Sequence, residues 1–314
     1  RLALANWLVG EQNPLLRRVA VNRLWEFVFG TGLVRTSEDF GLQGEWPSHP
    51  ELLDWLAVEF GRQGFRQRAM LKLLVRSAAF RRSSVTDPAI AELDPDNRLL
   101  ARFPRRRLPA EALRDQALYV GGLLVERTGG PSVKPYQPPG LWQEVAMLQS
   151  NTRTFVRGDG DDLWRRSLYT YWKRACPPPT LLTLDAPTRE FCSVRRITSN
   201  TPLQALALWN DEQFVEAARA LAQRSLQVAG PTDARLAAMF VRCTGHALDA
   251  TGLQQSQHLY EQLVARFRDN QADAQALLGV GEHPRPAEVD AAALAALTIV
   301  ANAYLNLDAT LYVD

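Results

Sequence analysis

Cysteine, methionine and lysine are scarce in this chain of 314 residues. The cysteines, Cys176, Cys192 and Cys243, are too few and too scattered for a disulfide framework, although Cys176 and Cys192 flank one loop and a pairing between them stays open. The absence of C-x-x-C-H excludes covalent attachment of a c-type haem to this chain. Four separated histidines without H-E-x-x-H or paired C-x-x-C predict no metal site and no cofactor in this segment.

Long apolar runs and a large net charge are also missing. The apolar runs are too short to cross a bilayer, so the sequence predicts no membrane span. A net charge of only +2 argues against a general nucleic-acid surface, and we expect no nucleic-acid partner. Gly-x-Ser-x-Gly and P-loop patterns are absent, which removes two common signatures of hydrolases and nucleotide-binding proteins.

Arginine, in contrast, is abundant and clustered. The segments Arg62–Arg82 and Arg102–Arg107 are rich in arginine. Guanidinium groups suit carboxylate, sulfate and phosphate partners, because their donors form a planar fork. An arginine-rich, high-GC genome would produce the same composition, so the clusters alone do not identify an anion site.

Apolar periodicity and helix-end signals predict a mainly α fold. Helices are expected at Pro14–Phe29, His49–Phe60, Arg66–Phe80, Leu108–Leu124, Pro202–Leu226, Thr232–Cys243, Gly252–Arg268 and Ala287–Asn306. The residues at 128–160 resemble a loop, and Ser167–Lys173 is the best candidate for a strand, with a partner expected within Val145–Val156. The prediction is a multi-helix bundle with long irregular loops and at most a small β element near 145–173.

The expected organisation has three parts that together form one compact unit. Residues 1–127 form an N-terminal helical part, 128–200 a loop-rich segment with short strands, and 201–314 a C-terminal helical bundle. The chain starts at Arg1 in what resembles the middle of a domain, so we expect it to be a segment of a longer protein.

The richest chemistry lies between Asp185 and Asp211, where a charged loop leads into a helix. Thr201 before Pro202 predicts an N-cap followed by proline at the first helical position. Loops held at a helix N-terminus are common positions for anion sites and catalytic groups. The segment is therefore the first candidate functional site.

Two kinds of chemistry are open to this loop. Asp185 and Glu190 are candidates for a general acid and base pair, as in glycoside hydrolysis. The predicted substrate-binding residues around them are Arg195, Arg196, Asn200, Tyr169 and Trp172, with Arg35 and Asp39 in a second loop at Val34–Pro47. Alternatively, Asp185 and Glu190 form ion pairs with the arginines and hold the loop in place.

Six ordered segments resemble the PSD1 (DUF1553) family of planctomycetes and related bacteria. They are Asn13–Gly41, Trp46–Phe60, Asp94–Asp115, Gly129–Val133, Arg165–Arg174 and Asp185–Asp211, and the ending Leu305–Asp314 is close to the usual family terminus. The positions at which the candidate loop and the following helix match the family are Asp185, Arg195, Thr201, Pro202, Gln204, Asn210 and Asp211.

The resemblance implies a location and partners, although no reaction is assigned to the family. Family members are usually C-terminal parts of large exported proteins, often with a cytochrome c-like haem module upstream. We therefore expect export to the periplasm or cell surface and a non-catalytic binding or assembly role. The expected partners are upstream domains of the same polypeptide, a haem or catalytic domain among them, and an anionic polysaccharide. The alternatives are a hydrolase or lyase on acidic or sulfated polysaccharide, using Asp185 and Glu190, and a purely structural role in a cell-surface assembly.

Overall fold

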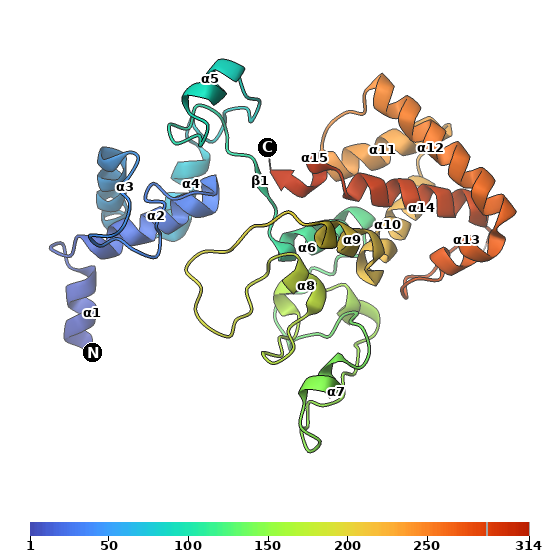
Figure 1. Ribbon diagram of the computed structural model, residues 1–314, viewed down its shortest axis with the longest axis horizontal. Coiled ribbons are helices and arrows are strands. Elements are labelled where there is room, and N and C mark those ends of the chain that lie inside the picture. Colours follow the sequence, from blue (N-terminus) through green and yellow to red (C-terminus); the bar gives the residue numbers. More distant parts are fainter. Residues whose placement is uncertain (287, 314) are drawn as a thin grey trace. The chain divides into compact units, whose positions relative to one another are not determined.

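The chain folds into two compact units, residues 1–106 and residues 107–313 (Figure 1). The computed structural model describes residues 1–286 and 288–313. The mainly α fold is confirmed, and the strands β1 (Arg106–Arg107) and β2 (Tyr312–Val313) pair in a short two-stranded sheet. No helix in the described part of the chain is long and apolar enough to cross a membrane. The unit boundary at 106 differs from the three-part division at 127 and 200. Helix α6 (Ala110–Gly121), expected in the N-terminal part, packs against α10 (Glu212–Ser225) of the second unit.

The core of the first unit contains buried aromatic side chains from two helices, α2 (Leu15–Phe29) and α3 (Pro50–Arg62). The other helices of this unit are α1 (Leu2–Val9), α4 (Gln67–Val75) and α5 (Pro88–Leu93). Trp25 and Phe29 of α2 stack with ring centroids 4.3 Å apart, and Leu56 and Phe60 of α3 are also buried. The buried Asn22 donates to the carbonyl of Val34 and accepts from its N–H, which fixes the start of the following loop on α2.

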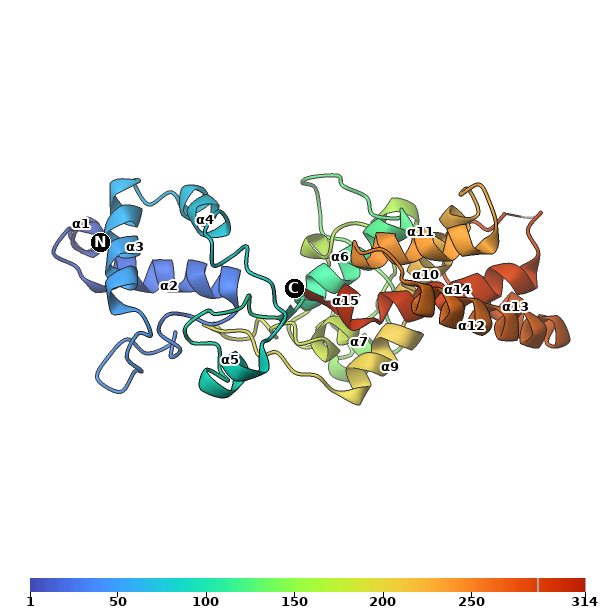
Figure 2. The ribbon, with the colours of Figure 1, turned by 90° about the horizontal axis from the view of Figure 1, so that it is seen from above.

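The second unit has a helical core centred on two helices, α10 and α14 (Figure 2). Its α-helices are α6 (Ala110–Gly121), α7 (Leu141–Val145), α8 (Pro179–Thr183), α9 (Pro202–Asn210), α10 (Glu212–Ser225), α11 (Thr232–Thr244), α12 (Ala250–Asp269), α13 (Gln271–Leu278), α14 (Ala291–Leu305) and α15 (Asp308–Leu311). Helix α14 is apolar on nearly all sides and is surrounded by other helices. A Cβ on Gly121 would lie 2.8 Å from the carbonyl oxygen of Ala217, so glycine allows α6 to approach α10 closely.

Several predicted boundaries differ from the observed ones. The helix expected at Pro202–Leu226 is two helices, because Asp211 takes an extended conformation and caps α10. The helix expected at Arg66–Phe80 ends at Val75, and α13 was not predicted. The strand expected at Ser167–Lys173 is a 3-10 helix, η2 (Ser167–Tyr169), followed by a parallel bridge between Thr170 and Val133. Its partner therefore precedes the predicted region, Val145–Val156.

Candidate functional site

The loop between α8 and α9 is closed at its base by Asp185, and it forms a long arc in Figure 1. The Asp185 carboxylate accepts hydrogen bonds from the Ser199 backbone N–H at 2.7 Å, the Ser199 hydroxyl at 2.8 Å and the Gln204 side-chain amide at 3.0 Å. Asp185 has a positive φ of 70°, a conformation that aspartate tolerates better than most residues. We call Asp185, Ser199, Gln204 and Arg107 the loop-base cluster.

The N-terminus of α9 holds this cluster in place. Thr201 and Gln204 form a capping box, in which each side chain accepts a hydrogen bond from the other residue's backbone N–H. Pro202 occupies the first turn, as the sequence predicts. Gln204 is only 1% exposed, and its side-chain oxygen also accepts from Arg107, which donates to the Ser199 carbonyl at 2.9 Å as well. The capping box thereby positions the amide that contacts Asp185.

The electrostatics of the loop-base cluster keep Asp185 ionised. Partial burial opposes ionisation, but hydrogen bonds from Ser199 and Gln204, together with the charge of Arg107, outweigh it and lower the pKa of Asp185. A carboxyl group with a lowered pKa is a poor general acid at neutral pH. The hydrogen bonds of Asp185 instead close the base of the loop.

Glu190, the other predicted catalytic carboxylate, lies on the exposed part of the loop. The backbone N–H of Glu190 contacts the Thr188 hydroxyl at 3.4 Å. The hydrogen bonds to the Asp185 carboxylate come from other residues, Ser199 and Gln204. Two open recesses of about 500 Å³ exist in the second unit, and neither is lined by Asp185 or Glu190. The structure does not bring the two carboxylates together in either recess.

Most predicted substrate-binding residues of this unit make contacts within the protein. Arg196 donates to both oxygens of Glu111, at 2.6 and 3.1 Å. Burial alone would raise the pKa of Glu111, but Arg196 outweighs it and lowers that pKa. Arg195 and Asn200 are exposed.

The predicted stacking faces of Tyr169 and Trp172 each have a guanidinium group over them. Arg165 lies 3.9 Å from the centroid of the Tyr169 ring, and Arg189 lies 4.3 Å from that of Trp172. The Trp172 indole N–H also donates to the Thr188 carbonyl at 2.8 Å. These two rings stabilise loops in the described structure, and a sugar would have to displace an arginine from each of these faces.

The second predicted loop, in the first unit, is likewise held by its own residues. Arg35 pairs with Asp96 at 3.0 Å, and the Asp39 carboxylate accepts from the Gly41 N–H at 2.7 Å. Asp39 thus stabilises a local turn, and Arg35 fastens its loop to the segment that follows α5.

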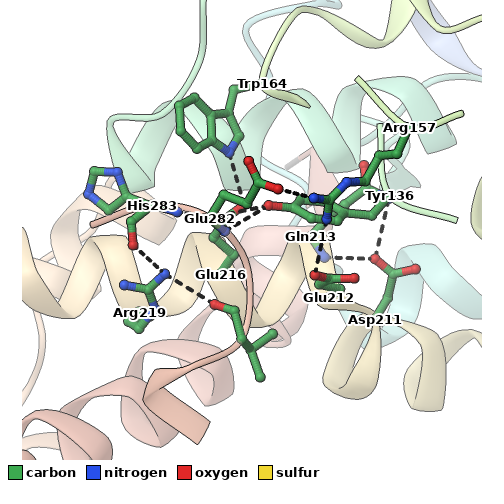
Figure 3. A network of polar contacts seen from close by, with 11 residues as sticks. Tyr136, Arg157, Trp164, Asp211, Glu212, Gln213, Glu216, Arg219, Glu282 and His283 are labelled. Atoms are coloured by element: carbon green, nitrogen blue, oxygen red, sulfur yellow. Dashed lines mark hydrogen bonds and ion pairs between the residues drawn. The ribbon is translucent and has the colours of Figure 1, made fainter. Parts of the chain in front are cut away.

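A buried polar cluster that the sequence did not predict centres on Glu216 of α10 (Figure 3). Its fully buried carboxylate accepts from the Tyr136 hydroxyl at 3.1 Å, the Trp164 indole N–H at 2.9 Å and the His283 backbone N–H at 2.7 Å. Burial, with the nearby charge of Glu216, raises the pKa of Tyr136, so its hydroxyl stays protonated and donates. A Cβ on Gly281 would lie 2.5 Å from Glu216, so the chain passes close to this carboxylate only because residue 281 is glycine.

The Glu216 cluster joins distant segments of the second unit. Arg219, one turn further along α10, donates to the carbonyls of Val280 at 3.1 Å and His283 at 2.8 Å (Figure 3). The available sequence signal was two charged residues, Glu216 and Arg219, within the otherwise apolar run Phe214–Ala222, which places both on the buried face of α10. Both oxygens of the Glu216 carboxylate accept from internal donors, which indicates an architectural role.

Two buried arginines organise the irregular segment that follows α6. Arg114 donates to the carbonyls of Leu163 at 2.7 Å and Arg165 at 2.8 Å, and to the side chains of Ser167 and Gln213. Burial lowers the pKa of Arg114 to about 10, although the charge of Asp115 opposes this effect. Arg165 donates to the carbonyls of Pro131 at 3.0 Å and Arg127 at 2.9 Å. The two side chains substitute for a backbone ladder in a region without regular strands.

Neither a metal cluster nor a disulfide is found among the described residues. No group of three or more histidine, cysteine, aspartate and glutamate side chains is placed to hold a metal ion there. Cys176, Cys192 and Cys243 are all free thiols. Burial raises the pKa of Cys243 to about 12, which makes it an unreactive core residue.

Comparison with known proteins identifies the family. The family model described as "PSD1: Protein of unknown function (DUF1553)" matches residues 1–260. No curated protein and no solved structure matches the chain. Because the match covers most of its length, the protein belongs to the PSD1 (DUF1553) family.

Proposed function

We propose that this domain is a non-catalytic binding and assembly module of an exported, multidomain bacterial protein. Its partners are other domains of the same polypeptide, among them a haem or catalytic domain, and an anionic polysaccharide. The observation that carries the proposal is the engagement of Asp185, whose carboxylate accepts three internal hydrogen bonds. Export and the neighbouring domains rest on the resemblance to the family.

Exposed apolar side chains support the partner-domain part of the proposal. Helix α1 buries none of its residues, and Leu2, Leu4 and Trp7 are 75%, 59% and 61% exposed. An apolar helix that is open to water marks an interaction surface. We assign another domain of the same polypeptide as the partner that covers α1.

A binding assay with matched variants tests this contact. The change Leu4→Ser with Trp7→Ser should weaken binding of the remaining domains, supplied as a separate chain, because it removes apolar area from α1. Leu42→Ser is the control, since Leu42 is fully exposed and lies outside α1. Equal binding by the unmodified domain, the double variant and the control would show that α1 does not contact the other domains.

The alternative function is a hydrolase or lyase that acts on acidic polysaccharide through Asp185 and Glu190. Catalysis by Asp185 would require its hydrogen bonds to Ser199 and Gln204 to break during the reaction. This requirement makes the enzyme the weaker of the two candidate functions. Incubation with acidic polysaccharides, followed by measurement of chain length, separates the two functions. We expect no shortening. Shortening that both Asp185→Asn and Glu190→Gln abolish would replace the binding proposal with the enzyme.

A further inference from the structure

A row of positive side chains runs along α4 in the first unit. Arg68, Lys72 and Arg76 are spaced four residues apart, so they share one face of the helix, and all three are exposed. The opposite face is occupied by Met70 and Leu74, which are buried in the core. Arg62 and Arg66 lie just before this helix and are also exposed. We call these five residues the α4 cationic row.

The α4 cationic row lacks the internal partners that other arginines of the same unit have. Arg18 pairs with Asp54 at 2.6 Å, and Arg35 pairs with Asp96. None of the ion pairs in the described residues involves a member of the row. The local sequence also offers no partner within a helical turn, because it contains no acidic residue from Arg62 to Arg82. Like charges one helical turn apart repel each other, and a bound anion relieves that repulsion.

The geometry of the row suits a linear polyanion. With a rise of 1.5 Å per residue, the charges on α4 stand roughly 6 Å apart and extend over about 12 Å along one line. Guanidinium groups recognise sulfate and carboxylate through paired hydrogen bonds. A chain that carries such groups at regular intervals can contact several members of the row at once.

Two other polyanionic partners fit less well. The apolar face of α4 is packed into the core, so the helix cannot insert into a lipid surface. Binding of single-stranded nucleic acid uses exposed aromatic rings for base stacking. Phe65 and Phe80, which flank α4 in the sequence, are instead half-buried and pack against Phe60 and Phe103, with centroids 5.4 and 5.3 Å apart.

We infer that the α4 cationic row is the surface with which this domain binds a linear polysaccharide that carries sulfate or carboxylate groups. The inference rests on the polysaccharide part of the proposed function and gives it a location. That location differs from the loop between α8 and α9, whose Arg189 and Arg196 are engaged by Trp172 and Glu111.

Binding of defined polymers to the full chain tests the inference. Dextran sulfate and neutral dextran share a backbone and differ in charge, while polygalacturonate presents carboxylates in place of sulfates. We expect binding to at least one charged polymer, none to dextran, and a loss of affinity as salt increases. The variant R68Q/K72Q/R76Q should bind about tenfold more weakly, because three surface charge contacts are lost while helix propensity is kept.

The matched control removes three charges from the second unit. R242Q/R266Q/R268Q changes net charge by the same amount at exposed positions near helix C-termini. We expect it to bind like the unmodified protein. Equal weakening in both variants would overturn the inference, because attraction would then follow net charge alone.

The remaining outcomes separate this inference from the proposed function. Absence of binding to both charged polymers overturns the location and the polysaccharide partner together, while the α1 contact is still judged by its own assay. Tighter binding of a DNA duplex, lost in R68Q/K72Q/R76Q, reassigns the row to nucleic acid. Polymer shortening that requires Asp185 and Glu190 overturns the non-catalytic proposal even if the row binds the polymer.

Discussion

Arginine has opposite roles in two regions of this molecule. In the second unit, Arg114 and Arg165 are buried and donate to backbone carbonyls, and Arg107 donates to Ser199 and Gln204. In the α4 cationic row of the first unit, the arginines are exposed and form no ion pair in the described structure. The difference shows that arginine content does not identify an anion surface. An anion surface is instead indicated by exposed arginines to which the fold supplies no hydrogen-bond acceptor.

The largest expected effect is the loss of a buried arginine. Arg114→Met keeps the aliphatic stem but leaves the carbonyls of Leu163 and Arg165 without their donors. We expect the free energy of unfolding to fall by about 3 to 5 kcal/mol, because buried acceptors remain unsatisfied. Urea denaturation followed by circular dichroism measures it. Arg68→Met on α4 is the control and should change stability by less than about 0.5 kcal/mol; similar losses in both variants would contradict the comparison.

The next effect concerns the carboxylate that closes the loop between α8 and α9. Asp185→Asn should cost about 1 to 2 kcal/mol at neutral pH, because charge-assisted hydrogen bonds to Ser199 are weakened. Since the pKa of Asp185 is lowered in the folded state, its contribution is present above the unfolded pKa and is lost as pH falls through the folded pKa. The difference between the two proteins should therefore shrink in acid.

Urea denaturation at neutral and acidic pH checks this dependence. Glu190→Gln is the matched control on the same loop, because the Glu190 side chain is exposed. We expect it to leave stability nearly unchanged at both pH values. If Glu190→Gln lowers the free energy of unfolding as much as Asp185→Asn does, both carboxylates stabilise the fold. If the stability difference between Asp185→Asn and the unmodified protein does not change with pH, the pKa of Asp185 is not lowered.

A smaller effect is expected at the N-cap of α9. Thr201→Ala removes the side chain that accepts from the Gln204 N–H and should cost about 1 kcal/mol. Thr201→Ser keeps the hydroxyl and should recover most of the loss. If serine and alanine are equally destabilising, the methyl group, and not the cap, explains the effect. Thermal denaturation of the three proteins distinguishes these cases.

The smallest effect has the opposite sign. Because R68Q/K72Q/R76Q removes like-charge neighbours on α4, it should leave stability unchanged or raise it by up to about 0.5 kcal/mol. Added salt should reduce the gain, since it screens the same repulsion. A clear loss of stability would show that the row supports the first unit, and would break the contrast with Arg114.

The helical architecture could be predicted because local signals and packing agree. Thr201 and Pro202 mark the start of α9, and Gly30, with positive φ, ends α2; Gly122 ends α6 in the same way, short of the predicted end at Leu124. The break at Asp211 was missed because its side chain caps α10 in the middle of a continuous apolar pattern. Ser167–Lys173 was predicted as a strand from β-branched and aromatic residues, but Ser167 is held from α6, where Asp115 accepts from its backbone N–H and Arg114 donates to its hydroxyl. Such long-range contacts leave no periodic signal.

The sequence predicted the charged loop but not the contacts of its side chains. The sequence placed Asp185, Glu190 and Arg196 in one charged loop, which is correct. Whether a carboxylate faces solvent or Ser199 depends on the path of the loop, and a linear pattern does not specify that path. Glu216 is a charged residue to which the sequence analysis assigned no role, and its burial became evident only from its position on the buried face of α10.

The hydrogen bonds between Asp185 and Ser199 fasten the two ends of the loop between them, independently of what lies between. A loop with fixed ends tolerates changes in length, since each doubling of a flexible loop costs only about 0.6 kcal/mol of closure entropy. The exposed residues from Glu190 to Val194 are therefore a position where an epitope or a reporter peptide can be inserted while both flanking helices keep their places.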